Sequence, residues 1–297
     1  MVLALGLAVV ACSEKSTPGA SGAIPDNAAP AYLDIRDRLG DDFIGVMTSA
    51  KTVLTPQVEQ QLKDNKQLLT ELLAATKAPR CDFKVDYSSG YNTLLSHLGP
   101  MRQLAYTLAL DARYHAEEGD RAGAAERLAA LVRLANATSD MPMMIEKLIG
   151  YATLALALET ANNLADEGLL SKSDMKPILD ALDDIDTNDP LNARQTINSE
   201  KRSALLALRD PSTAAELASE LSRVPEAERR AAMTEAESLF ATLDSAWTQP
   251  GAPQRMDRAI NAIRSRALKG LAPNMSGIWN NMDDARSNIK RFQQRFS

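Results

Sequence analysis

The stretch 101–164 carries apolar residues at helical spacing through three successive segments. The first segment places Leu104 and Leu108 on one face, and the second places Leu128 and Leu131 on one face. Ala and Leu, which are strong helix formers, dominate the chain, and no stretch shows sustained alternation with a period of two. These features predict an all-α fold.

The third segment, from about 143 to 164, is apolar on nearly all sides and has no charged residue from Leu148 to Leu158. A helix that is apolar all round is typically buried, and a run of this length is too short to cross a bilayer. We therefore predict a central helix here, surrounded by antiparallel helical hairpins. The core is expected over 27–170 and a looser helical layer over 171–297, in one continuous domain.

Capping signals mark helix starts elsewhere. Thr55, Asp189 and Asp210 each precede a proline, which is typical of an N-cap followed by the first helical residue. Ser171 with Asp174 three residues later resembles a capping box. A helix is also expected to start near Asn27. Further helices are predicted over 190–208, 211–221, 225–247, 252–269 and 277–294.

The stretch 79–92 has no helical period, yet it holds Cys81, Phe83, Tyr87 and Tyr91. Such a loop is either fixed to the core by its aromatic residues or part of a functional site. We favour the first interpretation.

An uncharged apolar run ends at Cys12, and the sequence 9–12 resembles a bacterial lipobox, in which the signal is cut before an acylated cysteine. The run is too short for a membrane-spanning helix and fits a signal peptide over 1–11. No basic residue precedes Cys12, which indicates a start site placed too far downstream. The alternative is a buried N-terminal element.

The lipobox resemblance implies that Cys12 carries fatty acyl chains, such as palmitate, and anchors the chain in a membrane. The Gly/Ser/Pro/Ala-rich stretch 12–26 is then a flexible tether. Ser13, rather than Asp, follows the cysteine, which favours the outer membrane, facing the periplasm. Cys81 remains as the single other cysteine, so no intramolecular disulfide is expected, and we predict that Cys81 is buried.

Four groups of landmarks look like those of a family of exported bacterial proteins that is all-helical and uncharacterised. They lie in 27–32, 79–83, 94–104 and 118–124, and the resemblance covers about 27–165. It implies an exported helical protein, with no activity and no functional residues to carry over. In addition, Gly119-Asp120 followed by Ala124 resembles the turn between the helices of a tetratricopeptide repeat, although no 34-residue period recurs.

The formal charge of −6 is uneven, because the stretch 251–297 alone carries +6. Nucleic acid is not expected as a partner of an exported acidic protein. The basic end is interpreted as a solvated helix face; the alternatives are contact with anionic lipid or with the protein's own acidic surface.

Few residues offer chemistry. The closest approach to a metal site is Asp111 with His115 on one helix face, but a site needs further ligands, such as Glu118 or His97. Cys81 and His97 are a possible nucleophile and base. We expect neither arrangement to be functional, and no metal and no cofactor are predicted. The common catalytic and phosphate-binding motifs do not occur.

Three functions remain open. The first is a membrane-anchored envelope lipoprotein that is not an enzyme and whose helical surface binds another protein. The second is a module that binds an apolar small molecule or lipid between helices near Met143, Met144 and Tyr151. The third is an enzyme of unknown class that uses Cys81 or the Asp111/His115 pair. We favour the first.

Overall fold

The computed structural model describes residues 23–50 and 53–297. Within these ranges the chain forms thirteen α-helices and four short 3₁₀ helices, and no described residue forms a strand. The predicted all-α class is confirmed. The helices are α1 (Ala28–Ala50), α2 (Pro56–Asp64), α3 (Lys66–Ala75), η1 (Tyr87–Asn92), α4 (Leu98–Glu117), α5 (Arg121–Asn136), α6 (Met144–Asp166), η2 (Lys172–Met175), α7 (Lys176–Asp183), η3 (Pro190–Gln195), α8 (Thr196–Arg209), η4 (Pro211–Leu217), α9 (Ala218–Ser222), α10 (Glu226–Ala246), α11 (Ala252–Asn261), α12 (Arg266–Leu271) and α13 (Met275–Phe296).

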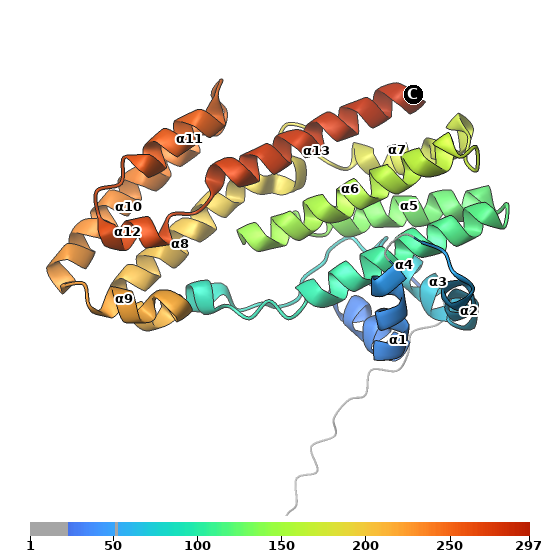
Figure 1. Cartoon of the computed structure of the whole chain (residues 1–297), viewed down its shortest axis with the longest axis horizontal. Helices are drawn as coiled ribbons and strands as arrows, with labels where there is room; N and C mark the ends of the chain where they lie inside the picture. Colours follow the sequence, from blue (N-terminus) through green and yellow to red (C-terminus); the bar gives the residue numbers. More distant parts are fainter. Residues whose placement is uncertain (1–22, 51–52) are drawn as a thin grey trace, which may run out of the picture.

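Helices α4, α5 and α6 are the three helices expected over 101–164, and each packs on the other two (Figure 1). A short turn at Gly119 joins α4 to α5, so the two form an antiparallel hairpin. Gly119 has a φ of 80°, a backbone conformation that glycine adopts without steric cost. The resemblance of this turn to a tetratricopeptide repeat stays a prediction.

The most completely buried of these three helices is α5, not α6. Beyond its first two residues, α5 has no exposed residue, because α3, α4, α6 and α7 all pack on it. The expectation that α6 is buried all round was wrong. Its outer stripe is partly open to solvent, and Ile145 on that stripe is 44% exposed. An apolar stripe needs a partner to be buried, and α6 has none on that side among the described residues.

The capping signals at Thr55, Asp189 and Ser171 hold in the structure, whereas Asp210 ends α8 and accepts a hydrogen bond from the Ser212 amide. The Thr55 side chain accepts a hydrogen bond from the Val58 amide, and Asp189 caps η3. Ser171 and Asp174 form the predicted capping box. Helix α1 starts directly after Asn27, as expected, and bends at Gly40.

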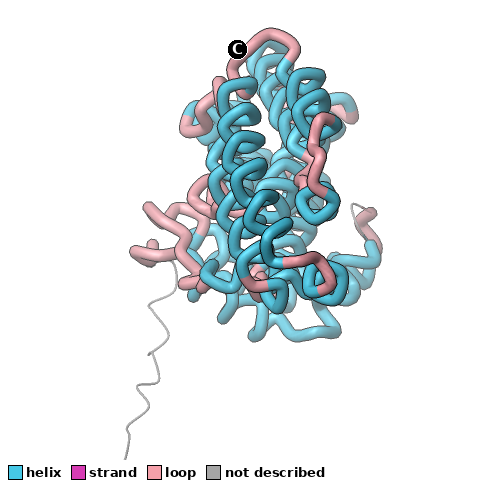
Figure 2. The backbone as a smooth tube through the Cα atoms, turned by 90° about the vertical axis from the view of Figure 1, so that its left-hand side faces the viewer, coloured by secondary structure: helices cyan, strands magenta, loops and turns pink. Residues whose placement is uncertain are grey.

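The layer formed by α8 to α13 extends to one side of the core, and α13 runs back from it along α6 (Figure 1). Seen from the side of α10 to α12, the backbone is mostly helix, with loops confined to the connections (Figure 2). The apolar face of α13, which includes Ile289 and Phe292, is buried, so this helix docks on the core rather than on a membrane. Buried apolar residues of both regions form one continuous cluster.

The segment between α3 and α4 links the two regions. Phe83 stacks on His97 at the start of α4, whereas the Tyr91 hydroxyl donates to the Leu271 carbonyl at the end of α12. The interpretation that its aromatic residues fix this loop is therefore confirmed. None of the helices in the described ranges combines the length and apolarity that a bilayer span requires.

Candidate functional site

Cys81 is buried, as predicted, with 9% of its surface exposed, and it lines a surface cleft described below. Burial raises the pKa of its thiol to about 12, and the nearby carboxylates of Asp82 and Asp140 add to the rise. The thiol therefore stays protonated at neutral pH, whereas nucleophilic catalysis uses the thiolate.

His97 is paired with Glu146. It is 2% exposed, and its Nε2 lies 3.1 Å from the Glu146 carboxylate. The Phe83 ring stacks on it with 4.5 Å between ring centroids. Neither Nδ1 nor Nε2 has a partner with hydrogen-bond geometry among the described residues, so the contact with Glu146 is a close approach rather than a hydrogen bond. No hydrogen bond joins His97 to Cys81 in the part of the chain that the structure describes.

Glu146, which lies beside His97, is fully buried. The sequence did not single it out. One oxygen accepts from the Tyr87 hydroxyl at 2.9 Å, and the other accepts from the Met143 amide at 2.8 Å. The second contact is a helix cap, and the glutamate three residues after Met143 was its sequence signal. The distant partners, Tyr87 and His97, had no such signal.

Lys147, the next residue, is also fully buried. Its ammonium group donates to the carbonyls of Thr138 and Ser139, at 2.6 and 2.8 Å, just after α5 ends. Burial lowers the pKa of Lys147 to about 7. Gln195 donates to the carbonyls of Ser139 and Met141 from the other side. The connection between α5 and α6 is thus held by two side chains from different elements.

Asp111 and His115 do lie together on α4, with 3.6 Å between Oδ1 and Nε2. Asp111, however, is buried and forms an ion pair with Arg127 of α5, while His115 Nδ1 lies 2.7 Å from Asp120. Burial raises the pKa of Asp111, and the Arg127 charge opposes that rise. Among the described residues no three His, Cys, Asp or Glu side chains gather closely enough to hold a metal ion.

The cleft that Cys81 lines has a volume of about 750 Å³. The end of α5 contributes Arg133 and Asn136, and the start of α1 contributes Tyr32. The segment after α3 and the segment after α7 complete the cleft, and both α3 and α7 pack on α5. This volume lies within the range of about 300–1,000 Å³ that is usual for ligand sites.

Tyr32 is the main buried polar group of the cleft. It is 1% exposed, and its hydroxyl forms no hydrogen bond with another described residue. Burial, the nearby Cys81 and, in the opposite sense, Arg133 act on its pKa, with a net rise. Unlike the ring nitrogens of His97, this hydroxyl is not sealed from solvent, so it is free for a ligand.

The sign of the charge differs between the segments that line the cleft. Lys77 and Arg80 follow α3, whereas Asp184 and Asp186 follow α7, and Asp140 lies between α5 and α6. Lys77 forms an ion pair with Glu126. Within the described residues Arg80, Asp140 and Asp184 have no ion-pair partner.

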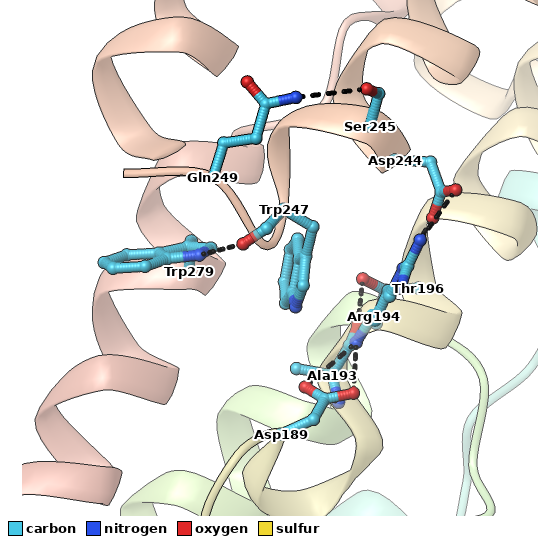
Figure 3. A network of polar contacts seen from close by, with 9 residues as sticks. All are labelled: Asp189, Ala193, Arg194, Thr196, Asp244, Ser245, Trp247, Gln249 and Trp279. Atoms are coloured by element: carbon cyan, nitrogen blue, oxygen red, sulfur yellow. Dashed lines mark hydrogen bonds and ion pairs between the residues drawn. The ribbon is translucent and has the colours of Figure 1, made fainter. Parts of the chain in front are cut away.

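One wall of the cleft is strained. Leu191 and Asn192 both have positive φ, 57° and 53°, a conformation that is costly for a side chain such as leucine. The Asp189 carboxylate accepts from the Ala193 and Arg194 amides, and Arg194 forms two hydrogen bonds with Asp244 of α10 (Figure 3). Strained backbone that its surroundings hold in place is often found at functional sites.

A second cavity, of about 840 Å³, lies in the C-terminal layer between α9, α10 and α12. We call it the apolar groove after Leu221, Val224, Ala232 and Ala267, although charged residues such as Glu228, Glu235 and Arg264 line it as well. Neither cavity is lined by Met143, Met144 or Tyr151, where the sequence suggested a ligand. Tyr151 is buried and donates to the Pro190 carbonyl.

The described chain begins at the rim of the cleft. The Asn27 side chain donates to the Asp82 carbonyl and accepts from the Asp82 amide, at 2.9 and 2.8 Å. The Ala28 amide donates to the Arg80 carbonyl. Cys12 itself lies outside the described residues, as does most of the predicted tether.

Comparison of the chain with protein-family models, with curated proteins and with solved structures gives no match in any of the three.

Proposed function

We propose that this chain is a lipoprotein of the bacterial envelope, anchored through Cys12 in the outer membrane, that binds another protein through its cleft without acting as an enzyme. The observation that carries the proposal is where α1, the first helix of the fold, begins. Asn27 and Ala28 are hydrogen-bonded to the segment 80–82, which forms the rim of the cleft. An anchored tether therefore holds the cleft, rather than the far end of the molecule, towards the membrane.

The length of the tether supports a role close to the bilayer. Fourteen residues, 13–26, lie between Cys12 and Asn27. A flexible Gly/Ser-rich segment of that length has an end-to-end distance of about 20 Å. A partner in the same membrane, or close to it, is then within reach of the cleft.

The chemistry of the cleft favours binding over catalysis. Arg80, Asp140 and Asp184 are charged, exposed and without ion-pair partners among the described residues, so they are available to a partner. The Cys81 thiol has a raised pKa, and Asp111 is neutralised by Arg127. The two enzyme hypotheses thus lack an activated group.

Site-specific photo-crosslinking in cells tests the proposal. A photo-reactive residue at position 80 or 184 is expected to give an adduct with an envelope protein, whereas one at Asp284, exposed on α13, is not. A Cys12→Ser variant should leave the membrane fraction. Retention of that variant would refute the anchor, and equal crosslinking from position 284 would refute the cleft as the binding surface.

The apolar groove favours one second candidate, which is binding of an apolar small molecule or lipid. Its volume of about 840 Å³ and its lining by Leu221, Val224 and Ala267 suit an acyl chain. Ala231→Trp should fill the groove and abolish the binding of a fluorescent fatty acid. Ala227→Trp, on an exposed position of the same helix, should leave it unchanged.

A further inference from the structure

We infer that the cleft recognises a short zwitterionic peptide, with its amino group towards the acidic segment after α7 and its carboxylate towards Arg80. This inference rests on the proposed function, since it takes the cleft as the binding surface. It adds the chemical class that the cleft recognises, a peptide with both chain ends free, which competes with the partner protein for the same surface.

The amino group is assigned by the carboxylates. Four acidic side chains line the cleft. Asp189 caps η3, which leaves Asp184 and Asp186 after α7 and Asp140 before α6. Asp140 and Asp184 have no ion-pair partner in the described ranges, and Asp186 accepts only from Asn188. Within the described residues these three carboxylates lie too far apart to bind one metal ion together. An ammonium group can be bound by carboxylates that do not all converge on one point.

The carboxylate is assigned by Arg80. Its two basic neighbours in the cleft are already used, because Lys77 and Arg133 both form ion pairs with Glu126 at 3.0 Å. Of the three basic residues of the cleft, Arg80 alone forms no ion pair within the described residues. A guanidinium binds a carboxylate in a two-pronged geometry that a single charge does not provide, so a free chain end is a well-matched ligand.

Tyr32 is the independent observation that points to a ligand. It lines the cleft at 1% exposure, and its hydroxyl has no partner among the described residues. Because this hydroxyl has no partner in the described residues, a ligand in the cleft can form a hydrogen bond with it. A peptide group offers both a donor and an acceptor to such a hydroxyl. The cleft volume of about 750 Å³ accommodates a peptide of a few residues.

Calorimetry with trialanine as the probe tests the inference on the full chain. One saturable site is expected. Acetylating its amino group or amidating its carboxylate should each weaken binding about tenfold, the usual loss for a hydrogen-bonded charge. In Asp140→Asn/Asp184→Asn, acetylation should no longer matter. In Arg80→Gln, amidation should no longer matter. Asp180→Asn, exposed on α7, is the matched control and should behave as the parent chain.

Tyr32→Phe keeps the ring and removes only the hydroxyl, so it should weaken all three probes alike, by about fivefold. Trialanine should also slow modification of Cys81 by a small thiol reagent in a Cys12→Ser chain, where Cys81 is the single thiol. Equal binding of blocked and free peptide, or no saturable binding, would overturn the inference. If crosslinking from positions 80 and 184 persists in that case, the proposed function stands and only the ligand class is wrong.

Discussion

The hairpin of α4 and α5 has two ends that satisfy their polar groups differently. At the turn end, Asp111, His115, Asp120 and Arg127 contact one another within a few turns of helix. At the open end, the groups after α5 and before α6 are satisfied from far along the chain, and the cleft opens beside them. Local pairing closes one end of the hairpin, whereas long-range pairing at the other end leaves a recess.

The largest expected effect is at the open end. Glu146→Ala leaves the Tyr87 hydroxyl and the Met143 amide without their acceptor and opens a cavity, so the free energy of unfolding should fall by about 3–5 kcal/mol. Denaturant titration measures it. Glu159→Ala, exposed on the same helix, should change stability by no more than about 0.5 kcal/mol. Equal effects of the two variants would contradict the role given to Glu146.

At the turn end, the stability lost through one substitution should be restored by a second substitution nearby. Arg127→Met leaves the buried Asp111 carboxylate with only His115 beside it, at 3.6 Å, and we expect a loss of about 3 kcal/mol. Asp111→Leu in the same chain removes the orphaned charge and should restore most of that loss. Unfolding of the two single variants and the double variant completes the cycle. If the double variant is as unstable as the sum of the singles, the pair does not act as a closed local unit.

Glycine-to-alanine substitution compares how tightly the two ends of the hairpin are packed, because each end has one glycine close to other side chains. A Cβ on Gly150 would lie 2.1 Å from the buried Thr138 hydroxyl and 2.8 Å from Leu191, so Gly150→Ala should cost about 2–3 kcal/mol. A Cβ on Gly123 would lie 2.2 Å from the Asp120 carboxylate, which is exposed and can move away. Gly123→Ala should therefore cost only about 1 kcal/mol, the value of the lost cap. A larger loss of stability in Gly123→Ala than in Gly150→Ala would show that the open end is packed less tightly than the turn end.

This contrast also explains what the sequence could reveal. Helix spans and caps such as Thr55 and Asp189 depend on neighbours within a few residues, so periodicity and capping patterns predicted them. The i, i+4 spacing likewise placed Asp111 beside His115. No such rule links Tyr87 to Glu146, 59 residues away.

The parts of the site that the sequence did not reveal depend on long-range packing. The cleft takes side chains from four separate segments, and neither Tyr32 nor Arg80 stands out in its own surroundings. The burial of α6 was overestimated for a similar reason. Hydrophobic pattern shows which faces can be buried, but the partner that covers a face comes from elsewhere in the chain, and the stripe with Ile145 has none in the described residues.

The most gradual expected effect concerns pH and again separates the two ends. Lys147 has a pKa of about 7 in the folded protein and about 10.5 when unfolded, so between these values the unfolded chain binds the extra proton. Stability from this group is complete above pH 10.5 and is lost as the pH falls towards 7. Between pH 7.5 and 9.5 the free energy of unfolding should therefore rise by about 1 kcal/mol per pH unit. Lys147→Gln should remove this slope, whereas Lys176→Gln, exposed on α7, should keep it. A slope that survives in Lys147→Gln would mean that the ammonium group is not held in the low-polarity surroundings that distinguish the open end.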